Sequence, residues 1–579
     1  MTYLKLVNKP IKQTTIMTTT NYYSLLGLLA PLAYGVYGLC SHFLEKSKIA
    51  SYKSLGSPIA FISIVVALAG ALMTYSFGAM TSPLLGMVGV GFSLKLDALS
   101  VLMFVMISLL GFIIVKFSQN YLDGDPRQKV FIARLAYTIA SVQLLVLSGN
   151  LGQLMFTWVL TSLALHQLLV FYRGRPGAII AARKKFIVAR LGDVFLLGAI
   201  VLIYIAFGTG DLGTIFSEVK TVFASEYSLH LEIATVCIAL AAILKSGQFP
   251  THGWLIEVVE TPTPVSALLH AGLLNAGPFL IVRMAFMMNE ATYAPAFLIV
   301  FGGFTALFAS VVFLTQPSVK VALGYSSVAH MGFMLLICGF GVYTAAMLHL
   351  VAHSFYKAHA FLSSGSVIDV VRANKVTLPA RLGSVFRIVG SILFALAIYF
   401  VMAMVWNIDP VHEFSLLATG AIVVMGLSQI LVPMLDTHSG FKGVLKASGL
   451  TVLVALSFFT LEEVFNVLLQ NQIPIIAQPS TLVVVLTSVT LAVFAAAVLL
   501  QLLAPVLDKN DTTYRWGVHF KNGFYANARF DRMVGSLKND HFTPVHLEIV
   551  EEDSADQYLR MPAKEEQQIK LQAVIADLK

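Results

Sequence analysis

Residues 245–270 have the sequence KSGQFPTHGWLIEVVETPTPVSALLH and lie between strongly apolar stretches on both sides. They include a lysine, a proline break, two glutamates, a TPTP turn and a histidine. An ionisable side chain at the centre of a bilayer costs roughly 3 kcal/mol or more unless it is paired or hydrated, so such residues mark functional sites. The stretch therefore predicts a helix broken inside a membrane, with a functional site at the break.

The composition supports this interpretation. Of 579 residues, 57% are hydrophobic and 12% are charged, and the mean hydropathy is +0.81. A net charge of +8 can indicate nucleic acid, but the Lys and Arg residues lie in short loops between apolar runs, where the positive-inside rule explains them better. We expect an all-α polytopic membrane protein, in contact with the lipid bilayer and with no nucleic acid.

The cysteines indicate no cofactor. Cys40, Cys237 and Cys338 each lie alone in an apolar segment, so they form neither a disulfide framework nor a CxxC metal pair. We therefore expect no zinc and no iron–sulfur site in this chain.

The apolar runs predict the number of spans. A bilayer core of about 30 Å needs roughly 20 apolar residues per helix, which predicts about 14 to 15 transmembrane helices. The expected spans are 22–44, 57–78, 98–120, 130–149, 152–172, 187–208, 230–249, 263–288, 293–315, 319–340, 342–368, 382–406, 412–437, 445–470 and 480–507. The span at 445–470 is the weakest, because Glu462 and Glu463 interrupt it.

The positive charges predict the orientation. Alternate loops place one group of basic residues on the same side: Lys46, Lys48, Lys53, Arg127, Lys129, Arg134, Arg173, Arg175, Arg183, Lys184 and Lys185. That side is expected to be cytoplasmic, with the N-terminus outside and the chain in the cell inner membrane. The charged tail at 508–579 is then cytoplasmic, and its stretch RWGVHFKNGFYANARFDRMVG suits either partner docking or a surface amphipathic segment without a specific partner.

The break itself suggests a proton carrier. Lys245 lies near the hydrophobic depth of a helix that Pro250 breaks, and a buried lysine can load and release a proton as its surroundings change. The alternative is a lysine that snorkels to the interface. Glu257 and Glu260 are three residues apart and can share a helical face, and TPTP delays the next helix until about Val265. His270 follows in that helix and can relay a proton, although a lone histidine is more often structural.

A second polar cluster lies in HLVAHSFYKAHAFLSSGSVID. His349, His353 and Lys357 are spaced i, i+4, i+8 and therefore line one stripe of a helix. Two histidines at this spacing can bind a metal, but no third ligand accompanies them in the sequence, so a hydrated proton path is the better interpretation. Lys320 and His330 are expected to connect the two clusters.

These motifs, together with SVKVALGYSSVAHMGFM, LKLDALS at 94–100 and ARLGDVFLLG at 189–198, resemble the antiporter-like proton-translocating subunits of respiratory complex I and the Mrp antiporters. The resemblance covers roughly residues 90–370. It implies inverted five-helix repeats with broken helices and a central proton carrier at Lys245. It also implies that the histidines matching His270, His349 and His353 line a hydrated axis, and we place Asp193 of the last motif on the same path.

The chain also departs from that pattern. The family has a glutamate directly after the tryptophan of its fifth helix, whereas Val159 follows Trp158 here, and His166 lies two helical turns further on as a candidate substitute. The family's second, distal break motif is absent beyond residue 370.

These departures and the NGFYANARFDR tail resemble the membrane subunits of DAB-type inorganic carbon pumps. That resemblance implies a DabA-like soluble partner, related to β-carbonic anhydrases, which holds zinc. It also implies that a cation influx, expected to be of protons, drives vectorial CO2 hydration to bicarbonate in that partner, so this chain is a transporter subunit and not itself an enzyme. The expected organisation is N-terminal helices at 1–92, an antiporter-like core at 93–370, C-terminal transmembrane helices at 371–507 and a soluble or interfacial, partner-docking tail at 508–579.

Three other interpretations remain. The chain can be a proton-pumping subunit of a complex I or hydrogenase type, which predicts a glutamate after Trp158 and a distal lysine. It can be a sodium/proton antiporter component of the Mrp type. It can also be a polytopic scaffold, which the density of ionisable residues between Lys245 and Lys357 disfavours.

Overall fold

The computed structural model describes residues 21–43, 49–172, 175–365, 385–435, 440–475, 479–503 and 511–534. The N-terminal elements are η1 (Ser24–Leu28), α2 (Leu29–Phe43), α3 (Ile49–Phe77), β1 (Met80–Thr81), β2 (Leu85–Met87), β3 (Val90–Phe92), β4 (Lys95–Leu96), α4 (Ala98–Tyr121), α5 (Gln128–Val146) and α6 (Leu151–Leu169). The central elements are α7 (Pro176–Phe207), α8 (Leu212–Phe223), α9 (Ser228–Lys245), α10 (Gly253–Glu257), η3 (Val258–Glu260), α11 (Thr263–Ala271), η4 (Leu273–Asn275), α12 (Ala276–Arg283), α13 (Ala285–Glu290), α14 (Tyr293–Leu314), α15 (Val319–Gly339) and α16 (Tyr343–Leu362). The C-terminal elements are α18 (Val385–Val405), α19 (Phe414–Leu435), α20 (Gly440–Leu469), α21 (Thr481–Leu503), α22 (Asp511–Lys521), η5 (Gly523–Tyr525) and α23 (Ala526–Met533).

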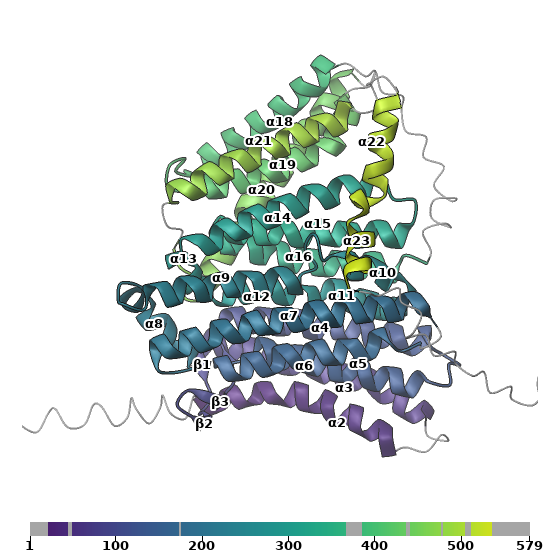
Figure 1. The fold of residues 1–579 in the computed structure, drawn as a ribbon, viewed down its shortest axis with the longest axis vertical. Coiled ribbons are helices and arrows are strands. Elements are labelled where there is room, and N and C mark those ends of the chain that lie inside the picture. The colour runs from purple at the N-terminus through teal and green to yellow at the C-terminus, as the bar shows by residue number, and fades with distance from the viewer. Residues whose placement is uncertain are drawn as a thin grey trace, which may run out of the picture. The chain divides into compact units, whose positions relative to one another are not determined.

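The described residues form a bundle of helices that lie side by side (Figure 1). Twelve helices in the described part of the chain are long and apolar enough to cross a membrane. Three further expected spans, at 152–172, 342–368 and 412–437, hold the helices α6, α16 and α19. The all-α polytopic class is therefore confirmed. In the described ranges, the strands are four short segments between α3 and α4, paired as β1 with β4 and β2 with β3.

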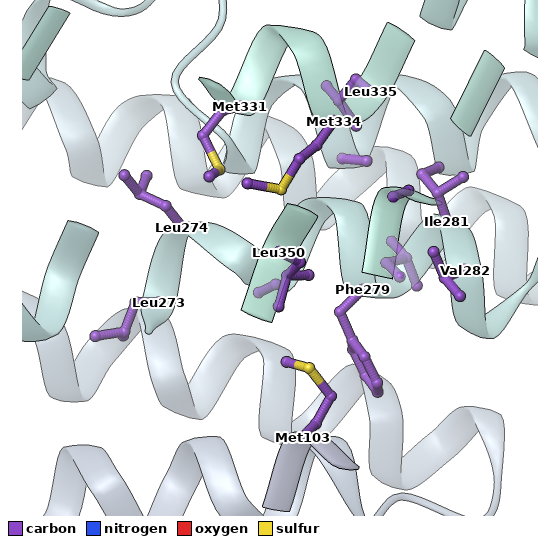
Figure 2. Close-up of a cluster of buried hydrophobic side chains, with 14 of the residues drawn as sticks. Met103, Leu273, Leu274, Phe279, Ile281, Val282, Met331, Met334, Leu335 and Leu350 are labelled. Carbon is purple, nitrogen blue, oxygen red and sulfur yellow. The ribbon is translucent and has the colours of Figure 1, made fainter. Parts of the chain in front are cut away.

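The most enclosed part of the bundle is the segment Thr263–Arg283, which contains α11, η4 and α12 and is fully buried. It packs against α4, α9, α15 and α16. Figure 2 shows apolar side chains of this segment and of its neighbours: Leu274 lies beside Met331 of α15, and Leu350 of α16 and Met103 of α4 lie near one another below Met334. His270, in α11, therefore lies in the most enclosed part of the described chain, whereas Pro250 and Glu260 of the break are exposed.

The break begins earlier than Pro250. Helix α9 ends at Lys245, and Gly247 then adopts a positive φ of 63°, a conformation that glycine reaches without steric cost. Helix α11 begins at Thr263, two residues before the expected Val265. Pro264 lies in its first turn, where a missing N–H breaks no helical hydrogen bond.

One expectation about the loops is wrong. The stretch before residue 187 was expected to be a charged loop, but α7 already begins at Pro176 and contains Lys184 and Lys185. Lys184 is fully buried and Lys185 is 5% exposed, because both pair with groups inside the protein. These two lysines therefore lend no support to the orientation predicted from loop charges.

The tail at the C-terminal end packs on the bundle as far as it is described. In Figure 1, the yellow helices α22 and α23 lie beside α14 and α10, and contacts join both pairs. The approach to α10 is so close that a side chain at Gly253 would collide with Asn527 of α23. The expected span at 445–470 is also a continuous helix, α20, despite its two glutamates.

Candidate functional site

Lys245 is held by the helix that lacks the family's glutamate. Its Nζ donates to the carbonyl oxygen of Trp158 at 3.1 Å and lies 3.4 Å from Thr161 Oγ1. The ammonium also lies 4.3 Å from the centre of the Trp158 ring, a distance at which a cation–π attraction is worth about 0.5–2 kcal/mol. Lys245, the last residue of α9, therefore binds to α6 through a carbonyl oxygen, a hydroxyl group and an aromatic ring, all of which stabilise a positive charge.

A carboxylate from α7 supplies the negative charge near Lys245. Asp193 is 7% exposed, and its Oδ2 lies 2.7 Å from Arg190 Nη2. Asp193 acts electrostatically on Lys245 and on Lys185, while Arg190 acts on both lysines with the opposite sign. Asp193 therefore pairs directly with Arg190 and acts on the two lysines over a longer distance, which makes it the candidate to replace the family's glutamate although it lies on a different helix.

Lys185 connects these residues to His166. Lys185 Nζ donates to the backbone oxygen of Ser162 at 2.5 Å and to its hydroxyl at 2.8 Å, and the charge of Lys185 acts on His166. A cavity of about 20 Å³ lies between Lys185 and Lys245, lined also by Thr161 and Ser162. A cavity of this size accommodates about one water molecule. We call Lys185, Arg190, Asp193, Lys245 and His166 the lysine group.

A second assembly contains four histidines and a lysine, and we call it the histidine group. His330 Nδ1 lies 3.0 Å from His349 Nε2, and the ring of His353 lies 5.0 Å from that of His330. Lys357 is fully buried, and its Nζ donates to the Leu323 oxygen at 3.2 Å. These residues come from α15 and α16, so His330 joins the stripe that the sequence predicted on α16.

His270 completes the histidine group from α11. It is 2% exposed, stacks on Phe361 with ring centres 4.3 Å apart, and lies within the electrostatic reach of Lys357. The structure therefore brings His270 together with Lys357 rather than with Lys245, although Lys245 is its neighbour in the sequence stretch that suggested the site.

Apolar side chains separate the two groups. Leu269, Leu273 and Leu274 line the small cavity beside Lys245. Figure 2 shows Leu274 beside Met331, which directly follows His330 in the chain. No hydrogen bond joins the two groups in the part of the chain that the structure describes, so a proton that passes between them requires a transient water chain or a movement of these apolar side chains.

Three other predicted path residues lie outside both groups. Glu257 Oε1 accepts from Lys184 Nζ at 2.5 Å and from Asn527 Nδ2 at 2.8 Å. Glu260 accepts from the Ala178 N–H at 3.2 Å. Lys320 Nζ donates to Thr263 Oγ1 at 3.2 Å. The structure gives each a local partner, and their part in a proton path stays a prediction.

Lys184 connects the C-terminal helix α23 to α7 and to the break after α9. Lys184 pairs with Glu257, with Asn527 at 3.0 Å and with Asp531, so one buried ammonium joins α7, the break and α23. His252, just before α10, is 1% exposed. Burial and, to a smaller extent, the charge of Lys184 lower the pKa of His252 from 6.5 to about 4, so this histidine is neutral at physiological pH.

The sequence analysis did not predict the burial or the partners of three further charged residues, Arg283, Asp97 and Glu462. Arg283 donates to Asp97 at 2.6 Å, and both are almost fully buried. Burial by itself would raise the pKa of Asp97, but the guanidinium outweighs it and holds the pKa below its usual value. Glu462 is 5% exposed and accepts from Thr344 Oγ1 at 2.7 Å. The one sequence signal that could have indicated the burial of these three residues is that each charge lies within an apolar run.

The comparisons identify the class of this fold and site. Residues 148–434 match the family described as "NADH:quinone oxidoreductase/Mrp antiporter, TM", and residues 84–132 match "NADH-Ubiquinone oxidoreductase (complex I), chain 5 N-terminus". The membrane-bound sulfane sulfur reductase, an archaeal respiratory membrane complex, has a chain with the same fold at a TM-score of 0.53 and 17% identity, over 90% of this chain and 100% of that one. The chain is thus an antiporter-like membrane subunit.

Two curated relatives define the family more narrowly. The probable inorganic carbon transporter subunit DabB2 of Halothiobacillus neapolitanus is 34% identical over 496 residues, which cover 85% of this chain and 88% of the relative. The probable inorganic carbon transporter subunit DabB of Hydrogenovibrio crunogenus is 40% identical over 272 residues, 47% of this chain and 52% of the relative. The chain belongs to the DabB family of inorganic carbon transporter subunits, as the sequence resemblance indicated.

Proposed function

We propose that this chain is the proton-conducting subunit of an energy-coupled inorganic carbon pump. The observation that supports this best is the presence of the lysine group and the histidine group inside one membrane-spanning bundle. Buried ionisable residues at this density are costly to a fold, and ion pathways are their usual reason in membrane proteins. Membership of a family of inorganic carbon transporter subunits supplies the substrate class.

The two groups would act as successive stations for a proton. In the lysine group, Asp193 balances the charge of Lys245 when the ammonium is protonated, and Arg190 keeps a fixed positive charge beside them. In the histidine group, the hydrogen bond between His330 and His349 carries one proton between two ring nitrogens, and Lys357 and His270 lie next to it. The apolar layer between the groups would prevent leakage until the coupled reaction moves it.

The hydration of CO2 would take place in a partner subunit. We propose a DabA-like soluble subunit, related to carbonic anhydrase, whose zinc hydrates CO2, while the ion path of this chain needs no resident cofactor. Moving one elementary charge across 100 mV releases about 2.3 kcal/mol, which can bias the hydration equilibrium by up to about fiftyfold. The chain would lie in the cell inner membrane, with the N-terminus outside and the tail in the cytoplasm, and the two subunits would form a heterodimer.

Growth in air tests this proposal. A host without carbonic anhydrase is grown with this chain alone, with the DabA-like partner, and with the partner plus Lys245→Ala. Only the unmodified pair is expected to restore growth, because Lys245→Ala removes the proton carrier of the lysine group. The matched control is Lys220→Ala on α8, an exposed lysine, which should restore growth as the parent does.

The proposal fails if the pair gives no growth, or if Lys245→Ala restores growth as well as the parent. Expression of each variant in the membrane is measured alongside, so that loss of growth is not confused with loss of protein.

The alternative function is a proton-pumping subunit of a complex I-like assembly or an Mrp-type cation/proton antiporter. The family match over residues 148–434, whose description names both assemblies, favours it. Val159 in place of the expected glutamate disfavours it. Exchange of sodium for protons by the purified chain in vesicles, without rescue of growth in air, would establish the alternative.

A further inference from the structure

The histidine group contains an arrangement that the sequence could not reveal. His349 and His353 are one turn apart on α16, and their stripe continues with Lys357 rather than with a third ligand. The fold supplies the third from α15: one nitrogen atom from each of His330, His349 and His353 lies within 4.8 Å of the others. The fold therefore supplies the third nitrogen that the stripe on α16 lacks.

The geometry is close to that of a bound transition metal. Nitrogens on a tetrahedral zinc, with bonds of about 2.0–2.1 Å, lie about 3.3 Å from one another. His330 Nδ1 and His349 Nε2 are already 3.0 Å apart. His353 is 3% exposed, and neither of its ring nitrogens has a hydrogen-bond partner among the described residues, so one of them is free to bind. The three nitrogens lie up to 4.8 Å apart, so side-chain movements of up to about 1.5 Å bring them to this spacing.

The ligand set selects the class of metal. Imidazole nitrogens favour zinc, copper, nickel and cobalt over calcium and magnesium, which prefer oxygen ligands. Among the described residues, the potential ligands in this cluster are the three histidines, with no carboxylate and no cysteine. Three protein ligands leave one tetrahedral position for a water molecule.

The site also has an approach. A cavity of about 490 Å³ reaches His330 and His349 from between α14, α15, α19 and α21. Its lining continues to Leu314 and Gln501, at the ends of α14 and α21, and includes the hydroxyl groups of Ser310 and Ser326. The cavity leaves unfilled space beside His330 and His349, with these serines and Gln501 among a lining that is otherwise mainly apolar.

We propose that His330, His349 and His353 form a binding site for an imidazole-preferring divalent metal of the zinc class, and that the bound metal stops the ion path. The metal takes the place of the proton between His330 and His349 and fixes both rings. The metal site itself stands on the geometry alone. Only the block of the path rests on the proposed function.

Metal binding is tested on the full chain in lipid nanodiscs, without the partner, so that a zinc site in the partner does not contribute. Cobalt(II) is the probe, because a tetrahedral site gives it an intense visible absorption. We expect one cobalt per chain, displaced by zinc. His330→Gln and His353→Gln should each weaken cobalt binding by more than about tenfold, as expected for loss of one of three ligands.

The matched control is His359→Gln, an exposed histidine on the same helix, which should bind cobalt as the parent does. Size-exclusion profiles and thermal unfolding verify that each variant is folded. If the folded parent binds no cobalt, or if folded His330→Gln binds it as tightly as the parent, the metal site is refuted.

The block is tested with a pH-sensitive dye in proteoliposomes. Zinc should stop proton flux in the parent and in His359→Gln at the concentration that displaces cobalt, and a chelator should restore the flux. Flux that continues while zinc is bound refutes the block. If the parent conducts no protons at all, the proposed function fails, whereas the result of the cobalt measurement still decides the metal site.

Discussion

The substitution Asp193→Asn tests how the chain compensates for Val159. It keeps the size of the side chain and removes the carboxylate that pairs with Arg190 and acts electrostatically on Lys185 and Lys245. The three cationic groups then lie together inside the bundle with the balancing charge gone. We expect a loss of both stability and proton flux.

The stability effect follows from the buried pair of Asp193 and Arg190, whose charged atoms are 2.7 Å apart. Removing one partner of a fully buried pair costs about 3–5 kcal/mol. The Arg190 side chain is 33% exposed, so water screens part of its charge and the expected loss falls to about 1–3 kcal/mol. For a chain of this size, such a loss lowers the midpoint of thermal unfolding by a few degrees.

The same substitution should also slow the proton flux. A carboxylate next to a lysine stabilises the charged amine by at least about 1.4 kcal/mol, which corresponds to a tenfold change in the loaded carrier. We therefore expect at least about tenfold slower proton flux in proteoliposomes, measured at a temperature where the variant is folded. The control is Asp123→Asn, which removes the carboxylate of an ion pair with Lys53 at the surface. That ion pair has the same length, 2.7 Å, as the pair of Asp193 with Arg190. Asp193→Asn with the flux of the parent would refute the role of this carboxylate.

Three further predictions follow from the same contacts. Val159→Glu in the Asp193→Asn background should restore part of the proton flux, because Lys245 already bonds to the preceding residue; no gain in flux over Asp193→Asn would contradict this. Lys184→Met should release α23 and raise hydrogen exchange at 526–533, whereas exposed Arg532→Gln should not; unchanged exchange in Lys184→Met would show that Lys184 does not hold the tail. His252 has a pKa of about 4 in the fold and 6.5 when unfolded, so its contribution to stability is complete above pH 6.5 and falls by up to about 3 kcal/mol towards pH 4. The unfolding midpoint of His252→Leu should therefore depend less on pH between 6.5 and 4 than that of the parent, and equal dependence would contradict this.

The sequence was sufficient for the helices and for the break. Apolar runs of about 20 residues specify spans through bilayer thickness alone, and the polar residues from Lys245 to Pro250 mark where a span ends. It was not sufficient for Lys184 and Lys185, which looked like loop charges. The burial of Lys184 depends on Glu257 and Asp531, and the burial of Lys185 depends on Ser162. These partners lie on other helices and are not neighbours of the lysines in the chain.

The same division applies to the site. The sequence by itself determined that His349, His353 and Lys357 share a stripe, because helical periodicity is a local property. Only the tertiary structure decided that His330 completes the three histidines, that His270 joins Lys357, and that Asp193 balances Lys245. The physical reason is that each of these relations joins different helices, and a pattern within one helix carries no information about which neighbour the packing will bring against it.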